Sequence, residues 1–431
     1  MKKIRIKGVE EDIFYEKLDN GLEVYLYTKD TVHSNYVTFT TKYGSVYNEF
    51  VPINSDKMTT FPKGIAHFLE HKVFAQKEDP QPMEFFARSG AVCNAYTTFK
   101  NTTYLFYATE SLKENIEYLL DYVQNIYLTD ESVENEKDII SEEIHMYDDR
   151  PMSILEEKVR KNTLKTNPYK DRIIGTTKDI RSITKEDLET CYHTFYHPSN
   201  MFIVITGNFN PDEALAIISE NQINKKFEKP FKIEVKKKKE KASVVKEKEV
   251  VKCNVEIDKV SIGIKVPLEE LNDIKLKEEE ISVYVNMILN ASFGRSSELR
   301  ERLVSGNIIT NGIFYDSFKT EDYLIINIIS ETPYPERYIS IIKEKINDLS
   351  DIDNELTRKS RVAISSLIFA LDNIETMNEM IVDNIVEYGH VVPNYYDIYK
   401  SLDLRKINKV GKIITKSPMS VLTLTKKVEE S

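Results

Sequence analysis

The chain has 431 residues, 41% of them hydrophobic and 30% charged, a balance typical of soluble globular proteins that excludes a wholly disordered chain. This length exceeds what one hydrophobic core usually supports, so we expect two domains. The formal net charge of -11 argues against a nucleic-acid partner, and the absence of a signal peptide or of an uncharged apolar run of about 18 residues predicts a cytoplasmic protein that makes no membrane contact.

The first half of the chain alternates strand and helix patterns. The pair Asn20-Gly21 separates two stretches rich in aromatic and branched residues, which predicts a β-hairpin. Residues 64–74 place apolar side chains at helical spacing, and residues 92–109 favour two further strands. The other elements predicted for this half are strands at 36–41 and 202–207 and helices at 111–127, 130–149, 184–196 and 211–220.

A charged segment divides the chain. Residues 227–252 are nearly all charged, with lysines alternating with glutamates, and we interpret them as a solvated linker between an N-terminal domain, 1–226, and a C-terminal domain, 253–431. A strand-to-helix pattern that begins at Tyr104 recurs at Tyr323, an offset of 219 residues. This recurrence indicates two related domains.

The clearest chemical pattern is His67-Phe-Leu-Glu70-His71. The two histidines stand four residues apart on a predicted helix, so their imidazoles share one face and could hold one metal ion. Glu70 lies beside that face, where its carboxylate could take a proton from a metal-bound water. H-x-x-E-H is a known spacing of zinc peptidases. The alternative is a chance match, in which the histidines are ordinary surface or core residues.

A catalytic zinc site needs a third protein ligand. Within the predicted helix 130–149, Glu136 and Glu143 fall in a stripe of apolar residues, whereas Glu142 points to the opposite side. Carboxylates on a buried stripe are costly unless they are paired or bind metal, so both need a partner. Either these carboxylates and the histidines bind a shared metal ion, or a lysine or arginine elsewhere forms salt bridges with the two glutamates.

These segments resemble the pitrilysin/insulinase family of inverted-motif zinc peptidases, which includes mitochondrial processing peptidase. Residues 64–71 (GIAHFLEH) look like the family's metal helix and residues 135–149 (NEKDIISEEIHMYDD) like its second one, in a match that spans almost the whole chain. The resemblance implies an α+β fold of two homologous domains, each a mostly antiparallel sheet packed with helices. It also implies one zinc ion per chain and assigns roles in the site: His67, His71 and Glu143 as ligands, Glu70 as general base on the zinc-bound water, and Glu136 as a catalytic-site residue that orients the centre.

The resemblance extends to substrate contacts. Residues 94–99 (NAYTTF) are similar to a strand whose exposed edge pairs with the substrate, which gives Asn94 and Ala95 a substrate-binding role. In the family's second domain an arginine and a tyrosine seven residues later help to hold the substrate. Here Arg300 matches the arginine, but Asn307 stands where the tyrosine is expected.

We therefore expect a zinc metalloendopeptidase that hydrolyses short or flexible peptides inside a chamber. Relatives of this length form half of such a chamber, which implies a homodimer, or a heterodimer with a homologous chain that can be zinc-less and that completes the pair broken at Asn307. One alternative is a non-catalytic assembly or peptide-binding subunit of the same fold, although such chains usually lose the metal residues. Another is a different metal hydrolase, because zinc and a general base do not define a peptide substrate.

Overall fold

The computed structural model describes residues 1–349 and 352–427. The chain forms two compact units, each assembled from three stretches of sequence. The first unit contains residues 1–144, 172–237 and 367–394, and the second contains residues 145–171, 238–366 and the chain from residue 395 onward. Each compact unit therefore contains segments from both of the domains predicted at 1–226 and 253–431. The division into two homologous domains at these boundaries stays a prediction.

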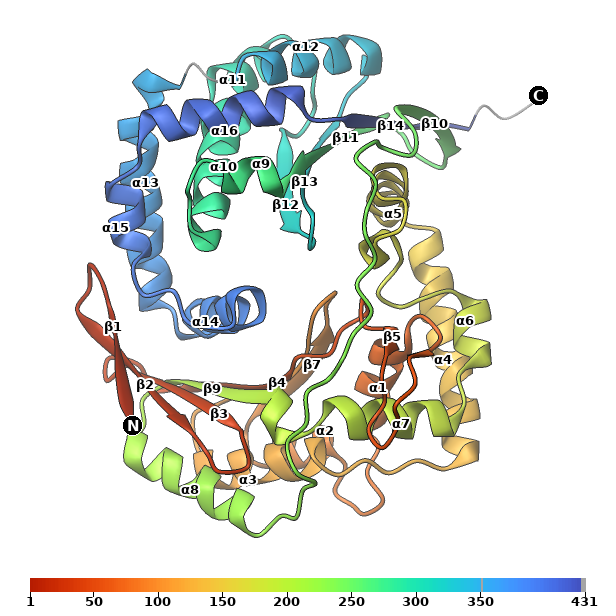
Figure 1. Cartoon of the computed structure of the whole chain (residues 1–431), viewed down its shortest axis with the longest axis vertical. Coiled ribbons are helices and arrows are strands. Elements are labelled where there is room, and N and C mark those ends of the chain that lie inside the picture. The colour runs from red at the N-terminus through yellow and green to blue at the C-terminus, as the bar shows by residue number, and fades with distance from the viewer. Residues whose placement is uncertain (350–351, 428–431) are drawn as a thin grey trace. The chain divides into compact units, whose positions relative to one another are not determined.

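The first unit is built on a seven-stranded sheet in the order β1-β2-β3-β9-β4-β8-β7 (Figure 1). Neighbouring strands are antiparallel except β3 and β9, which are parallel. The hairpin predicted around Asn20-Gly21 is confirmed as β2 and β3. The strands of this unit, including the short pair β5 and β6, are β1 (Lys2–Ile6), β2 (Glu11–Lys17), β3 (Glu23–Thr28), β4 (Asn35–Thr41), β5 (Glu49–Phe50), β6 (Thr59–Thr60), β7 (Val92–Thr97), β8 (Thr102–Ala108) and β9 (Met201–Gly207).

Helices cover both faces of this sheet. The helices that lie mainly in the first unit are α1 (Ile65–Val73), α2 (Pro82–Arg88), α3 (Leu112–Val123), α4 (Asp130–Asp148), α6 (Thr177–Ser182), α7 (Lys185–Phe195), α8 (Pro211–Ile223) and α14 (Ile374–Tyr388). In Figure 1, α3 and α8 lie on one face and α14 on the other. Buried Asn378 fixes α14 there, because its amide oxygen accepts from the Thr38 hydroxyl at 2.7 Å and its amide nitrogen donates to the Tyr36 carbonyl at 3.1 Å.

The second unit repeats part of this topology. Its sheet has the order β10-β14-β11-β13-β12, with one parallel pair, β10 and β14, followed by antiparallel pairs, which is the pattern of β3-β9-β4-β8-β7. The strands are β10 (Lys248–Cys253), β11 (Lys259–Pro267), β12 (Phe314–Lys319), β13 (Tyr323–Glu331) and β14 (Met419–Lys426). The predicted α+β class with two similar, mostly antiparallel sheets is therefore confirmed.

One helix packs closely on this second sheet. The helices of the second unit are α5 (Pro151–Thr163), α9 (Leu268–Asn272), α10 (Glu278–Phe293), α11 (Glu298–Ser305), α12 (Pro335–Asn347), α15 (Tyr395–Lys400) and α16 (Leu404–Lys416), and α13 (Asp353–Asp372) runs from the second unit into the first. A Cβ at Gly263 of β11 would lie 2.6 Å from the Thr163 hydroxyl of α5, so glycine is what lets helix and sheet meet. Buried residues of α10, α12 and α16 pack with alternate side chains of β11 in a separate core.

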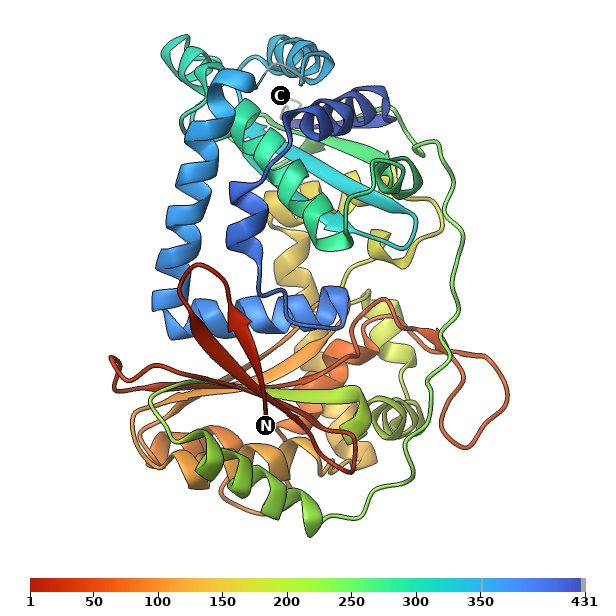
Figure 2. The same ribbon diagram turned by 60° about the vertical axis from the view of Figure 1, so that its left-hand side comes forward.

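The charged segment between the two sheets is only partly a solvated linker. Residues 225–247 contain no helix or strand and appear as an extended trace in Figure 2, whereas Lys248–Lys252 belong to β10. Within the segment, Glu240 is buried and pairs with buried Lys265 of β11 at 2.8 Å. Sequence alone could not single out this glutamate, because its neighbours have the same composition.

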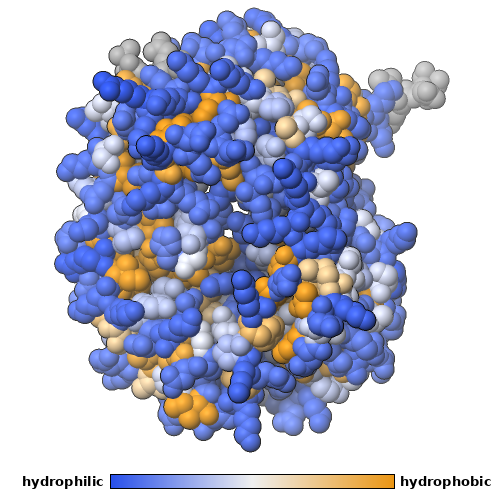
Figure 3. All heavy atoms as spheres, viewed as in Figure 1, coloured by the Kyte–Doolittle hydropathy of each residue, from blue (hydrophilic) through white to orange (hydrophobic). Residues whose placement is uncertain are grey.

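The face of the protein drawn in Figure 3 is mainly polar, because hydrophilic residues cover most of it. Over residues 1–349 and 352–427, no helix is both long enough and apolar enough to cross a membrane.

Candidate metal centre

Helix α1 presents the histidine motif because of how it begins. Gly64 precedes the helix with φ 83°, and a Cβ there would lie 2.4 Å from the Ile174 carbonyl oxygen, so only glycine fits. From this start, Phe68 and Leu69 turn into the core and are fully buried. The motif residues consequently line the partly exposed side of the helix.

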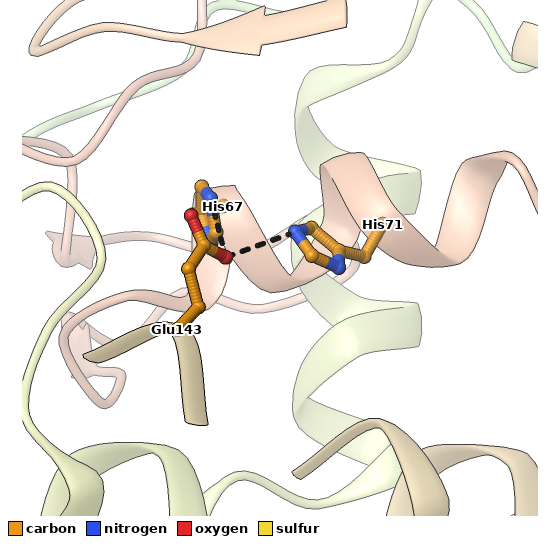
Figure 4. A group of neighbouring side chains, drawn as sticks. All are labelled: His67, His71 and Glu143. Atoms are coloured by element: carbon orange, nitrogen blue, oxygen red, sulfur yellow. Dashed lines mark ion pairs between the residues drawn. The ribbon is translucent and has the colours of Figure 1, made fainter. Parts of the chain in front are cut away.

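Three side chains converge on one point (Figure 4). The Glu143 carboxylate of α4 points at both rings, with its Oε2 atom 3.8 Å from Nε2 of His67 and 3.6 Å from Nε2 of His71. One ligand atom from each of the three residues lies within 4.8 Å of the others. Ligands about 2.1 Å from a tetrahedral zinc lie about 3.4 Å apart, so the donor set and its spacing fit this metal.

The two histidines differ in their surroundings. Burial, together with the neighbouring His71, lowers the pKa of His67 to about 3, so its ring is neutral and keeps a lone pair for a metal. Burial also acts to lower the pKa of His71, but the hydrogen bond and charge of Glu136 outweigh it and raise that pKa. Nδ1 of His71 lies 3.0 Å from the Glu136 carboxylate, which leaves Nε2 directed at Glu143.

Helix α4 turns the side chains toward α1 that the apolar stripe in the sequence predicts. Glu136 and Glu143 are partly buried and face α1, while Glu142 is exposed. Burial opposes ionisation of Glu136, but the hydrogen bond from His71 and the charge of Lys72 hold its pKa below the usual value. The Lys72 ammonium is almost fully buried and donates to the Ser132 carbonyl at 3.2 Å and to Glu136 at 3.4 Å. Glu136 is thereby fixed against His71.

Glu70 connects the metal group to the edge of the sheet. The Thr97 hydroxyl donates to its carboxylate at 2.5 Å, and burial raises the pKa of Glu70. Thr97 is the last residue of β7, which is an edge strand of the seven-stranded sheet. On the same strand, the Ala95 N–H bonds the side-chain oxygen of exposed Asn94 at 2.9 Å, so this N–H points away from β8.

The structure brings most of the predicted site residues together. His67, Glu70, His71, Glu136 and Glu143 form one cluster, and Asn94 and Ala95 lie on the edge strand that ends at it. Arg300 lies in the second unit, where its guanidinium donates to the Arg295 carbonyl at 3.4 Å, and Asn307 has φ 52°.

Sequence reasoning missed two residues of the cluster. The only sequence feature that pointed to Thr97 was its position within residues 94–99, the strand predicted to pair with the substrate. Lys72 carried no signal, because a lysine on a short helix is normally solvated.

Two histidines and a glutamate with metal-ligand spacing, beside a partly buried carboxylate at a sheet edge, form the arrangement expected of a metal-dependent hydrolase. The chain belongs to peptidase family M16, the insulinase family: residues 56–177 match the family model described as "Insulinase (Peptidase family M16)" and residues 182–360 match "Peptidase M16 inactive domain". It is 35% identical to the Bacillus subtilis protein "Uncharacterized zinc protease YmfH" over 96% of each chain. It is also 27% identical to the Neurospora crassa "Mitochondrial-processing peptidase subunit beta" over 46% of this chain and 43% of that one.

Solved structures give the same assignment. An M16-like peptidase from Alicyclobacillus acidocaldarius superposes with a TM-score of 0.88 and 29% identity, over 97% of this chain and 99% of that one. A Helicobacter pylori protease shares the fold with a TM-score of 0.83 at 20% identity, over 96% of this chain and 99% of that one. With the family established and the His67–His71–Glu143 group in place, the chain is classed as a zinc protease.

Proposed function

We propose that this protein is a zinc-dependent endopeptidase that cleaves short or flexible peptides. The observation that carries the proposal is the position of Glu70, which lies between the metal-ligand group and the last residue of edge strand β7. A peptide paired with that edge would run directly past a general base.

Each side chain of the site has its own role in hydrolysis. His67, His71 and Glu143 would hold the zinc ion, which supplies Lewis acidity that activates water and polarises the scissile carbonyl. Glu70 takes the proton from the attacking water and returns it to the leaving amine nitrogen, as its raised pKa suits. Thr97 orients that carboxylate through its hydroxyl, and Glu136 fixes the ring of His71 through Nδ1.

The outer edge of β7 provides a place for the substrate backbone. Within the described chain β7 pairs only with β8, so its other edge can accept an additional strand. The Ala95 N–H on this edge is occupied by the Asn94 side chain. A substrate carbonyl would take that N–H and displace the Asn94 oxygen, which gives both residues a role in binding.

A second copy or a homologous chain is the proposed partner. Relatives of this family carry names such as mitochondrial-processing peptidase subunit beta, which describe parts of assemblies. Arg300 matches the arginine that holds substrate in the family, and Asn307 replaces its tyrosine. A partner chain would then supply the complete pair.

Replacing Glu70 with Gln tests the mechanism. The ligands remain, so zinc content measured by mass spectrometry should stay at the wild-type value, while peptide hydrolysis should fall by about 10²–10⁴-fold. Unchanged turnover in Glu70→Gln would contradict the assignment of the general base.

Glu143→Gln and Glu142→Gln form a matched pair for the metal assignment. The first removes a ligand and should lower zinc affinity, while the second alters an exposed neighbour and should leave affinity unchanged. If the full-length chain bound zinc as predicted but cleaved no member of a peptide library, alone or with a homologous chain, the non-catalytic alternative would be favoured.

A further inference from the structure

The second unit contains a charged cluster at the topological counterpart of the metal centre. Helix α10 lies between strands β11 and β12 in the chain as α1 lies between β4 and β7, and α13 follows α12 as α4 follows α3. Among the described residues, only the group on α1 and α4 brings three His, Cys, Asp or Glu side chains close enough together to hold a metal ion. On α10 and α13 the corresponding polar residues include a buried lysine, Lys359.

Lys359 is held by neutral hydrogen-bond acceptors, and the charged neighbours that act on it among the described residues are Arg358 and Glu355. Its side chain is 3% exposed, and its ammonium donates to the Asn290 side-chain oxygen at 2.8 Å and to the Ser296 hydroxyl at 2.9 Å. Burial lowers the pKa of Lys359 and neighbouring Arg358 lowers it further, while the charge of Glu355 acts in the opposite direction. A desolvated cation beside a second cation is costly, and Glu355 offsets only part of this cost, because two positive charges face its one negative charge.

The loop that holds Lys359 is tightly built. A Cβ at Gly294 would lie 2.4 Å from the Asn290 carbonyl oxygen and 2.7 Å from its side-chain oxygen, so glycine allows the loop 294–297 to fold back on the end of α10. This places Asn290 and Ser296 on the same ammonium. Arg300 of α11 holds the other side of the loop through the Arg295 carbonyl.

Arg358 brings a second cation to the same serine. Its guanidinium donates to the Ser296 hydroxyl at 3.2 Å and to the Ser296 carbonyl at 3.4 Å, and its side chain remains 46% exposed. Arg358 also forms an exposed ion pair with Glu355, which leaves one positive charge in excess among Arg358, Lys359 and Glu355. Because the Ser296 oxygen accepts from both cations, its own O–H is the group it has left to donate.

We propose that Ser296 and Arg358, backed by Lys359, bind an oxyanion, either the carboxylate at the end of a peptide or a free phosphate. Arg358 offers its remaining N–H groups and Ser296 its hydroxyl, which together suit the two oxygens of such a group. Lys359 supplies positive charge from behind the serine and does not touch the ligand. The site is independent of the proposed peptidase activity, because it is defined by binding alone.

Phosphate binding to the zinc-loaded full chain tests the proposal by calorimetry. Arg358→Gln and Ser296→Ala should each weaken phosphate binding by about 10-fold or more. The control is Arg361→Gln, an exposed arginine on the same helix, which should bind as the wild type does. Both arginine variants keep the metal centre, so phosphate that coordinates zinc contributes equally to each. Lys359→Met should also lose binding, and the surface variants carry the test if it fails to fold.

Competition separates the two sources of the oxyanion. If a peptide with a free C-terminal carboxylate displaces phosphate and its amidated form does not, the ligand is a peptide end. If neither displaces phosphate, the ligand is a free phosphate group. Equal phosphate affinity in the wild type, Arg358→Gln and Ser296→Ala, or no binding to the wild type, would overturn the proposal.

Discussion

Replacing Glu240 with Gln should destabilise the second unit, because it removes the counter-ion of a buried lysine. The side chains of Glu240 and Lys265 are both fully buried and lie 2.8 Å apart. The carboxylate also accepts from the backbone N–H groups of Thr166 and Asn167, each at 2.7 Å. Breaking a buried pair by removing one partner costs about 3–5 kcal/mol, because the remaining charge stays desolvated. Such a loss is a large share of the roughly 5–15 kcal/mol that stabilises a typical domain.

The assay should resolve the two units. Denaturant unfolding followed by circular dichroism gives the overall loss, and hydrogen exchange at the amides of residues 165–167 assigns it to the second unit. Glu336→Gln is the matched control, because Glu336 pairs with Lys248 at the same distance, 2.8 Å, but with side chains 72% and 54% exposed. The control should lose less than about 1 kcal/mol. If Glu240→Gln were no more destabilising than Glu336→Gln, the argument from burial would be refuted.

The pH dependence of the same variant follows from the pKa of Glu240. Burial opposes ionisation, but the hydrogen bonds from Lys265 and from three backbone N–H groups lower this pKa to about 2. A lowered folded pKa stabilises the protein above the unfolded value, about 4.3, and this contribution disappears as the pH falls from there toward about 2. The stability difference between the wild type and Glu240→Gln should therefore shrink between pH 5 and pH 2. A difference that stayed constant over this interval would contradict the assignment.

Three further predictions concern the metal centre. Glu136→Gln should weaken zinc affinity by about 10–100-fold in a metal titration, because His71 loses the carboxylate at its Nδ1. Thr97→Val should lower kcat by about 10-fold at unchanged zinc content, whereas Thr97→Ser should restore it, since only the hydroxyl contacts Glu70. Ala95→Pro removes an outward-pointing N–H and should raise KM by about 5–10-fold with little change in kcat. Ala95→Ser is the control, because it keeps the N–H. If the substrate does not pair with β7, the two variants should have the same KM.

Patterns that are local in the chain predicted the fold well. The Asn20-Gly21 turn and the flanking residues gave the β2–β3 hairpin, and the spacing of Ile65, Phe68 and Leu69 gave helix α1. The recurrence from Tyr104 to Tyr323 corresponds to β8 and β13, each followed by a helix, α3 and α12. These patterns predict the structure correctly because they depend on residues only a few positions apart in the chain.

Contacts between distant segments could not be predicted in the same way. Nothing in its own neighbourhood marks Lys72 as buried, because the reason is Glu136 on another helix. Glu240 lies among residues of the same composition, and only the fold brings Lys265 to it. Helix α14 packs on the sheet of the first unit although it lies near the end of the chain, which no periodic pattern indicates. Burial of charge and long-range packing are thus the parts that required a structure.

Asn307 shows why the departure from the family pattern is more than the loss of one side chain. It follows the end of α11 and Gly306 with φ 52°, a left-handed conformation that asparagine tolerates and that bulky residues adopt at a cost of about 1–2 kcal/mol. The backbone here is therefore suited to the residue present, and a tyrosine at this position would be strained. A tyrosine side chain is therefore not available at position 307 of this chain. In the first unit, by contrast, the predicted metal ligands and Glu70 come together from two helices of one compact unit.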